Sequence, residues 1–456
     1  MQGILQYLRR RGFECIDSTY YGHISNWLRW YQGKVIDFHT YKQYNGRCQI
    51  TRERKSLGMA KSIAEDWANL ALNEKLDITI AEKRTHQIVS EVLERNQFKT
   101  RANQLVEKAF ALGTGAFVEY KENNETRIDY VRGSMIYPLT WHNGEIRECA
   151  FASMRTASKQ QQLYLNIHRL ESGQYVIENH MFSVNGETLG GEIDLPPDVE
   201  AEYRTYSDVP MFQIVRPNIV NNIDLDNPMG VSVFANAIDQ LKGIDLVYDS
   251  YCNEFRLGKK RITVPISMAR IAMEEDGSAR PVFDDNDTEF YAVPETQNGE
   301  NKITEHNMEL RYQAHEAGLQ TGLNLLSYKC GLGKDRYNFQ DGQVKTATEV
   351  VSEKSDLFQN LKKHELVLRS AIVGMVKAVE ILEGLSTEPE ITVNFDDSII
   401  EDVGAEKQRF LQEIRDGVRQ KWEYRMKFFG EDETTAKSMI TEEDPDPFGF
   451  GRSGDA

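Results

Sequence analysis

The sequence lacks the features that mark several large classes of protein. No apolar run reaches the roughly 18 residues that a membrane-spanning helix needs, so we expect no membrane partner. The five cysteines are odd in number and scattered, without a Cys-x-x-Cys pair, which indicates neither a disulfide framework nor a zinc site. Gly-x-Ser-x-Gly and His-Glu-x-x-His, which are typical of hydrolases and zinc proteases, are also missing.

The glycine-rich segments do not match a nucleotide-binding motif. Residues 331–334 read Gly-Leu-Gly-Lys, but Asp335 follows where a P-loop needs Ser or Thr. The Gly-Thr-Gly at 113–115 follows a predicted helix rather than a strand and lacks the third glycine of a dinucleotide site. We therefore expect no enzymatic activity, no catalytic residues, no cofactor and no metal. The surplus of Asp and Glu keeps a carboxylate metal site open as an alternative.

Positive charge is scarce and unevenly distributed. The formal net charge is −17, which argues against tight, non-specific wrapping of nucleic acid. Residues 1–56 are the exception, with ten Lys and Arg against four Asp and Glu, and many aromatic residues. Such a segment is either a nucleic-acid surface or a packing arm, and we favour the arm because no recognised binding motif accompanies it. Residues 274–300 and 388–456 are acidic, at about −8 and −9.

Residues 1–230 predict an α+β domain. Apolar residues with helical spacing fill residues 57–112. From residue 116 the period changes to two, which predicts an antiparallel meander joined by hairpin turns at 123–124, 143–144, 172–173 and 185–186. The predicted strands are 116–120, 127–131, 145–155, 162–169, 174–181 and 212–215.

Three long helices are predicted at 231–258, 304–330 and 346–385. The first two helices carry broad apolar stripes at heptad-like spacing. Together they would form a hairpin with some apolar surface left exposed, and packing against the same hairpin of a neighbouring copy would bury that surface. We interpret His315, on the second stripe, as a satisfied interhelical histidine rather than a ligand or base. The stripe residues that we expect to pack between subunits are Phe234, Leu241, Tyr248, Phe255, Tyr312, Leu319 and Leu326.

An insert at 259–303 joins the first two helices and contains β-like runs at 262–266 and 289–293. Its opening cations complement a helix C-terminus; they are Lys259, Lys260 and Arg261. Its acidic turn lacks the central Gly and the final Glu of a calcium loop, so a solvated turn is favoured. The aspartates of that turn are Asp284, Asp285 and Asp287.

A glycine-containing loop at 331–345 joins the second and third helices. It places cations beside an aromatic ring, in the residues Lys334, Arg336, Tyr337 and Lys345. By itself such a loop is most simply a connection with solvated charges.

The order of these parts resembles that of a tailed-bacteriophage portal protein. Two long helices with a small β module at one end and a Gly-rich loop at the other look like the stem, clip and tunnel loop of that family. The resemblance covers about residues 20–440 and points to the siphophage branch of Gram-positive hosts. The matching stretches are SVFANAIDQLKGIDLVYDSYCNEFRLGKKR (232–261), LQTGLNLLSYKCGLG (319–333) and KTATEVVSEKS (345–355).

The resemblance implies a portal-type α+β subunit that forms a ring with a central tunnel. Its parts would be a wing at 1–230, stem helices at 231–258 and 304–330, a clip at 259–303, a tunnel loop at 331–345, a long helix connecting wing and crown at 346–385, and a crown at 386–440. Residues 441–456 are acidic and rich in Pro and Gly, and we expect them to be disordered.

The resemblance also implies a function. Portals are head–tail connectors, usually dodecameric, at one capsid vertex of the virion, after assembly in the host bacterial cytoplasm. Double-stranded DNA enters through the ring during packaging and exits at infection. The clip residues named above would dock the terminase large subunit and later the head–tail adaptor, and major capsid and scaffolding proteins would be further partners. The four tunnel-loop residues named above would contact DNA.

Two alternatives stay open at this point. The chain could be a metal-dependent nuclease or another DNA-processing enzyme of the packaging machinery. It could also be a head-morphogenesis protein without a tunnel. The native mass would separate a ring from a monomeric enzyme.

Overall fold

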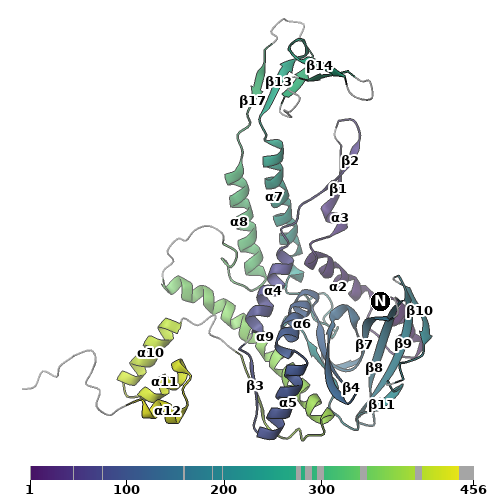
Figure 1. Ribbon diagram of the computed structural model, residues 1–456, viewed down its shortest axis with the longest axis vertical. Coiled ribbons are helices and arrows are strands. Elements are labelled where there is room, and N and C mark those ends of the chain that lie inside the picture. Colours follow the sequence, from purple (N-terminus) through teal and green to yellow (C-terminus); the bar gives the residue numbers. More distant parts are fainter. Residues whose placement is uncertain are drawn as a thin grey trace, which may run out of the picture. The chain divides into compact units, whose positions relative to one another are not determined.

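Figure 1 shows a computed structural model of the chain, which forms two compact units, residues 1–395 and 396–456. The structure describes residues 2–44, 46–73, 75–157, 160–186, 188–197, 199–273, 279–282, 290–294, 302–338, 347–395 and 403–440. The acidic tail at 441–456, which the sequence predicts to be disordered, lies outside the described residues.

The basic N-terminal segment folds into helices and a hairpin. Its aromatic residues Tyr20, Tyr21, Trp27 and Trp30 are buried, so they pack into the fold instead of facing a ligand. This burial favours the packing arm over a nucleic-acid surface. The elements are α1 (Gln2–Arg10), α2 (Ser18–Tyr31), α3 (Ile36–His39), β1 (Thr40–Tyr44) and β2 (Gln49–Glu53).

The region predicted to be helical contains three helices and one short strand. These are α4 (Met59–Ala71), β3 (Asp77–Ile80), α5 (Lys83–Arg95) and α6 (Phe98–Leu112). α6 is central because it packs against α2, α4, α5, β4 and β5. Its buried residues follow the i, i+3, i+4, i+7 pattern of an apolar helix face: Ala102, Leu105, Val106, Ala109 and Phe110.

The predicted meander forms two sheets instead of one. The smaller sheet has the order β12-β4-β5, and the larger has the order β10-β9-β8-β7-β6, with β11 on a second part of the β9 edge. All six predicted strands are confirmed, and β6, β10 and β11 are additional. The strands are β4 (Gly115–Glu122), β5 (Glu125–Arg132), β6 (Ile136–His142), β7 (Glu145–Ala157), β8 (Gln160–Glu171), β9 (Gln174–Asn185), β10 (Thr188–Ile193), β11 (Glu202–Arg204) and β12 (Phe212–Val215).

Backbone geometry explains the turn residues and one glycine-rich segment. The residues at 123–124, 143–144 and 172–173 have φ between 50° and 84°, as type I′ hairpin turns require. At Gly113, φ is +83° and an added Cβ would lie 2.2 Å from the Gly230 carbonyl oxygen. Tyr20 donates its O–H to the same carbonyl at 2.8 Å. The Gly-Thr-Gly at 113–115 is therefore a point where two backbone segments cross at close distance. The short 3-10 helix η1 (Gly133–Met135) follows β5.

Helices α7 (Ile238–Leu257) and α8 (Tyr312–Lys329) pack side by side in opposite directions (Figure 1). We call this pair the stem hairpin, after the part that the sequence predicted here. Both helices begin later than predicted, at 238 instead of 231 and at 312 instead of 304. Residues 231–234 are buried, Val233 N–H donates to the Phe110 carbonyl at 2.9 Å, and η2 (Ala235–Ala237) follows. An added Cβ at Gly322 would lie 3.0 Å from Ile244, so this glycine allows a close helix approach.

The insert between the stem helices contains strands, as predicted. β13 (Arg261–Pro265) pairs in parallel with β16 (Phe290–Val293) and antiparallel with β17 (Thr304–His306). The 3-10 turn η3 (Ile266–Met268) leads to a second pair. That pair is β14 (Arg270–Met273) with β15 (Ala279–Val282).

The third long helix, α9 (Ala347–Leu382), packs on β12, β4, α5 and α4. His364 on its buried side lies between the rings of Trp67 and Phe110, with centroids 4.8 and 5.0 Å away. A short strand, β18 (Ile391–Asn394), follows α9. β18 pairs with β3 and belongs to the first unit, although the predicted crown began at residue 386.

The second unit is helical over its described residues. Its helices are α10 (Val403–Arg415), α11 (Lys421–Phe429) and α12 (Glu433–Ser438). Residues 416–420 separate α10 from α11 and are not helical. Phe410 is buried and meets the rings of Tyr424 and Phe428 edge-on, which forms a small aromatic core.

Candidate functional site

One carboxylate fixes the far end of the stem hairpin. Arg311 donates from Nε and Nη2 to the two oxygens of Glu254, at 3.1 and 2.8 Å. These hydrogen bonds lower the pKa of Glu254 to about 2. His315 Nε2 lies 3.5 Å from the same carboxylate, and its ring meets Tyr251 edge-on. The interpretation of His315 as a satisfied interhelical histidine is confirmed.

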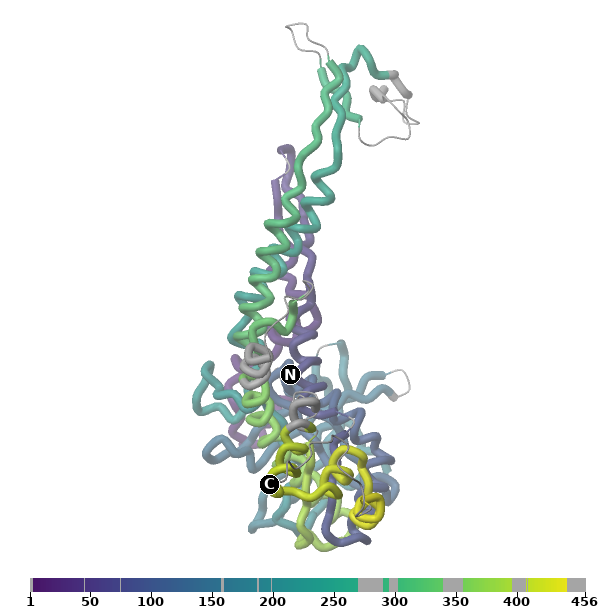
Figure 2. The backbone as a smooth tube through the Cα atoms, turned by 90° about the vertical axis from the view of Figure 1, so that its left-hand side faces the viewer, coloured from purple at the N-terminus to yellow at the C-terminus, as the bar shows by residue number. Residues whose placement is uncertain are grey.

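A buried polar cluster attaches the N-terminal arm to α7. Val35 N–H donates to His39 Nδ1 at 2.9 Å, so the imidazole carries a proton on Nε2 and donates it to Asp245 Oδ2 at 2.9 Å. The other oxygen of Asp245 accepts the Leu57 N–H at 2.8 Å. One turn along α7, Asp249 accepts another backbone N–H of the arm at 3.1 Å. The arm therefore supports the base of the stem, and Figure 2 shows its hairpin running beside the stem helices.

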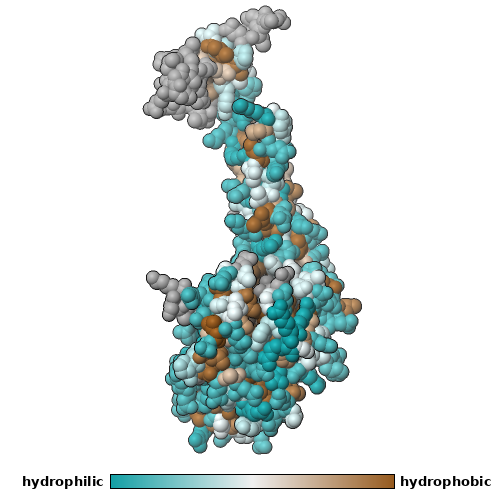
Figure 3. Space-filling view, turned by 90° about the vertical axis from the view of Figure 1, so that its right-hand side faces the viewer, coloured by the Kyte–Doolittle hydropathy of each residue, from teal (hydrophilic) through white to brown (hydrophobic). Residues whose placement is uncertain are grey.

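The outer surface of the stem retains large apolar side chains. Figure 3 shows apolar residues interrupting the hydrophilic surface along the narrow part formed by the stem and the arm. In the single chain these side chains are between 45% and 64% exposed. We call them the stem apolar row: Leu246, Phe255, Leu257, Met308, Tyr312, Leu325 and Tyr328.

The sequence-predicted stem residues fall into two groups. Phe255 and Tyr312 belong to the stem apolar row, while Tyr248 and Leu319 are half-buried. The other three residues are buried within their own chain, and at most 3% of each residue is exposed: Phe234, Leu241 and Leu326. The exposed group, and not the whole stripe, is available to a neighbouring copy.

The start of the 331–345 loop is anchored on α4. Trp67 Nε1 donates to the Cys330 carbonyl at 3.0 Å. The residue before Trp67, Asp66, accepts hydrogen bonds from the Tyr337 hydroxyl at 2.7 Å and from Arg336 Nη2 at 3.1 Å. Burial and the Asp66 carboxylate raise the pKa of the Tyr337 phenol, which stays protonated. The chain from 330 to 337 is thus held in a defined position.

These contacts decide what each predicted loop residue can offer. Tyr337 is buried, and Arg336 is partly used by its ion pair with Asp66. Lys334 is exposed, and among the described residues it has no ion-pair partner. Lys345 and the loop from 339 onward lie outside the described residues.

The predicted clip cations lie at the start of the insert and are exposed. Lys260 forms an ion pair with Glu305 at 2.9 Å across the β13–β17 pair. Arg261 donates to the Leu257 carbonyl at 3.2 Å, which is the helix C-terminal contact expected for a cation there. Asp284, Asp285 and Asp287 lie outside the described residues.

Sequence reasoning missed the residues that fix the arm and the loop. Asp66, Trp67 and His39 act on partners more than 200 residues away, so no local pattern reveals them. Asp245 and Asp249 offered a usable signal, because they are acidic residues one helical turn apart on the buried face of α7. Buried carboxylates require partners, and the arm supplies them.

Two searches of the described part of the chain are negative. No group of three or more His, Cys, Asp or Glu side chains there is arranged to hold a metal ion. No helix there is long and apolar enough to cross a membrane.

An α+β body that carries a two-helix hairpin with a β insert at its end defines a portal-type subunit. The family model described as "Phage portal protein, SPP1 Gp6-like" matches residues 14–443. The chain therefore belongs to this family of phage portal proteins. No curated protein sequence matches it. Family membership gives the chain a structural role in the virion, at a capsid vertex and in an oligomeric assembly with capsid-associated partners.

Proposed function

We propose that the chain assembles head to tail into a ring, usually a dodecamer in this family, that surrounds the DNA channel of the portal vertex. The stem apolar row carries this proposal. Isolated apolar residues are normal on a surface, but several large ones are exposed along this one hairpin. Helical spacing places Leu246 and Leu257 on one side of α7 and Phe255 on the opposite side, which suits the two unlike surfaces of a head-to-tail contact. A heterologous contact that repeats around an axis closes into a ring when the rotation permits it.

The proposed channel uses the loop that begins at residue 331. Lys334 is the described loop cation best able to meet a phosphate, since Arg336 and Tyr337 are engaged by Asp66. A loop with few free cations in a chain of net charge −17 suits sliding more than gripping, because each neutralised phosphate adds salt-dependent affinity. Double-stranded DNA would enter through this channel during packaging and leave at infection.

The proposed docking platform is the insert at the end of the stem. Its exposed cations Lys259, Lys260 and Arg261 would contact the terminase large subunit and later the head–tail adaptor. The Glu254–Arg311 contact would hold the insert in a fixed direction relative to the stem. Major capsid and scaffolding proteins would contact the ring elsewhere.

A charge placed in the stem apolar row tests the ring proposal. Leu325→Glu puts a carboxylate where a neighbouring stem would cover it, and 55% of Leu325 is exposed, so the subunit should still fold. The matched control is Leu411→Glu in the second unit, where 48% of the leucine is exposed. We expect the stem variant to give monomers and the control to give rings in native mass spectra. Intact rings from Leu325→Glu at normal yield would overturn the proposed interface.

A further inference from the structure

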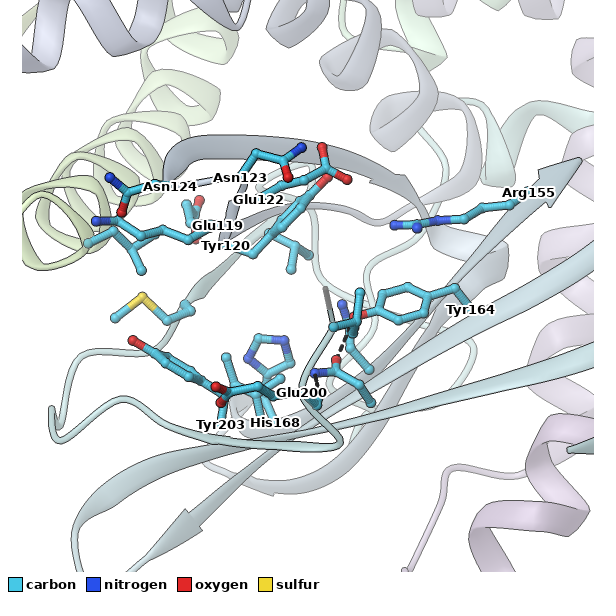
Figure 4. Close-up of a pocket in the computed structure, with 18 residues that line it drawn as sticks. Glu119, Tyr120, Glu122, Asn123, Asn124, Arg155, Tyr164, His168, Glu200 and Tyr203 are labelled. Carbon is cyan, nitrogen blue, oxygen red and sulfur yellow. Dashed lines mark hydrogen bonds between the residues drawn. The ribbon is translucent and has the colours of Figure 1, made fainter. Parts of the chain in front are cut away.

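The first unit holds its aromatic residues in place even where a cavity opens between its sheets. Tyr164 on β8 lines a cavity of about 380 Å³ between β4 and the large sheet (Figure 4). Its hydroxyl donates to Asn179 Oδ1 at 2.6 Å, and the Arg155 guanidinium lies over its ring at 4.6 Å. Neighbouring strands of the large sheet therefore satisfy both the ring and its cation.

The second unit exposes its aromatic residues instead. Helix α11 contains one Trp, one Tyr and two Phe, yet none of its residues is buried. Among the side chains of the second unit that the structure describes, only those of Phe410 and Ala436 are buried. Three helices of 13, 9 and 6 residues with so little core are too small to be stable by themselves. Another segment is therefore needed to cover part of their surface.

The uncovered apolar side chains gather on one side of α11. Trp422, Met426 and Phe429 follow each other at i, i+4 and i+7, which places them on one helix face. Trp422 and Met426 are half-buried, and 63% of Phe429 is exposed. Tyr424 and Phe428 lie on another side, where they pack on the small core. We call Trp422, Met426 and Phe429 the α11 face.

The α11 face is rimmed by positive charge, although the whole chain has a net charge of −17. The nine residues of α11 include three cations and one carboxylate, a net charge of +2. The Arg425 guanidinium lies 5.4 Å from the centre of the Phe429 ring, and Lys437 Nζ of α12 lies 4.6 Å from the centre of the Trp422 ring. Both cations also pair with carboxylates of the unit, so an incoming acidic segment would join these pairs. The face suits a segment that combines acidic and aromatic side chains.

The segment that follows α12 has this composition. Four of residues 441–446 are Asp or Glu, and Phe448 and Phe450 are the only large apolar residues of 441–456. So few apolar residues cannot form a core of their own. The structure describes the chain up to Ile440, just after α12, which packs on α11. From there to Phe448 the chain spans up to about 29 Å, against about 14 Å for the length of α11.

We propose that residues 442–450 dock on the α11 face of the same chain and complete the core of the second unit. The four carboxylates would meet the cations around the face, and the two phenylalanine rings would cover its apolar side chains. A segment tethered by a short linker has an effective concentration on the order of millimolar, which favours it over a separate partner.

Hydrogen exchange of the assembled full-length protein tests the docking. The ring variant combines Phe448→Ser with Phe450→Ser. The charge variant changes four carboxylates to amides: Glu442→Gln, Glu443→Gln, Asp444→Asn and Asp446→Asn. We expect the backbone amides of residues 421–429 to exchange about tenfold faster in each variant, a change of about 1.4 kcal/mol.

The matched control is Ser453→Ala combined with Asp455→Asn, which changes two residues of the same segment that the docking does not use. Its α11 amides should exchange as those of the wild type do. Unchanged exchange of α11 in the ring and charge variants would overturn the proposal and would leave a neighbouring copy or another protein to cover the face. Equal acceleration in the control would overturn it as well.

Photo-crosslinking locates the docked segment without relying on lost protection. With p-benzoylphenylalanine in place of Phe448, we expect crosslinks to α11 of the same chain. Their yield should fall in Phe429→Ser and stay unchanged in Val418→Ser, where 74% of the valine is exposed outside the face. Crosslinks only to another copy or to another surface would overturn the proposal. Neither experiment bears on ring assembly, so this inference and the proposed portal function fail separately.

Discussion

The attachment of the N-terminal arm to the stem makes a quantitative prediction. Asp245→Ala removes the acceptor of the buried His39 Nε2–H and of the partly buried Leu57 N–H. An unpaired buried donor costs about 1–3 kcal/mol and a partly buried one about 1 kcal/mol, which gives a loss of about 2–4 kcal/mol. The side chains of the pair are 8% and 5% exposed, so solvent does not compensate.

Hydrogen exchange of the arm hairpin measures this loss directly. Since about 1.4 kcal/mol corresponds to a factor of ten, the backbone amides of residues 40–53 should exchange roughly 30- to 700-fold faster in Asp245→Ala. Amides of the large sheet should keep their protection, because the change is local. Mass spectrometry of peptic peptides resolves the two regions.

The matched control for this prediction is Asp239→Ala on the same helix. The Asp239 side chain is 88% exposed and pairs only weakly with Lys242 at 3.2 Å, so its removal should cost less than about 1 kcal/mol. Unchanged exchange of the hairpin in Asp245→Ala would show that the buried His39–Asp245 cluster does not hold the arm. Equal acceleration in both variants would show the same, since the effect would then not come from the buried cluster.

Three further predictions concern the stem, the loop and the fully buried carboxyl of Glu119. Asn253→Pro should break α7 at a cost of about 3 kcal/mol or more, and electron micrographs should show few or malformed rings; normal rings would contradict the role of this helix. Lys334→Ala combined with Arg336→Ala should leave the rings intact but change the packaged DNA length or its retention in particles, and wild-type values would refute the DNA contact. Burial raises the pKa of Glu119 in the folded chain well above 4.5. The free energy of unfolding is therefore unaffected by this group below about pH 4.5, and it falls as the pH rises toward the folded pKa, because the unfolded chain ionises first. The gain in melting temperature of Glu119→Gln over the wild type should therefore grow from about pH 5 to about pH 8, and a shrinking gain would contradict the neutral carboxyl.

Local patterns in the sequence were sufficient for the strands, the hairpin turns and the existence of the long helices. A period of two between Asn-Gly or Asn-Asn pairs specifies a hairpin through backbone sterics alone, and the positive φ values at 123–124 and 143–144 agree. The heptad stripe likewise predicted two packed helices, because side chains at that spacing share one face. The ring itself was not predicted by these patterns and entered through the family resemblance.

Long-range contacts explain what the sequence could not predict. Residues 231–234 continue the apolar pattern of α7, yet they are not helical, and the Val233 N–H donates to the Phe110 carbonyl of α6. Residues 304–306 lie in a strand because β13 is available to pair with them. The Tyr337–Asp66 hydrogen bond joins residues 271 positions apart, so only the folded chain shows that the predicted stacking group is engaged.

The central claim is that the uncovered apolar row of the stem drives assembly into a ring without a nucleotide or a metal ion. Native mass spectrometry of the purified wild-type chain, in ordinary salt with EDTA present, tests it most directly. We expect a closed oligomer of about twelve subunits, the usual number in this family, at micromolar concentration. A stable monomer under these conditions would contradict it, and a monomer that cuts DNA when magnesium is added would favour a nuclease instead.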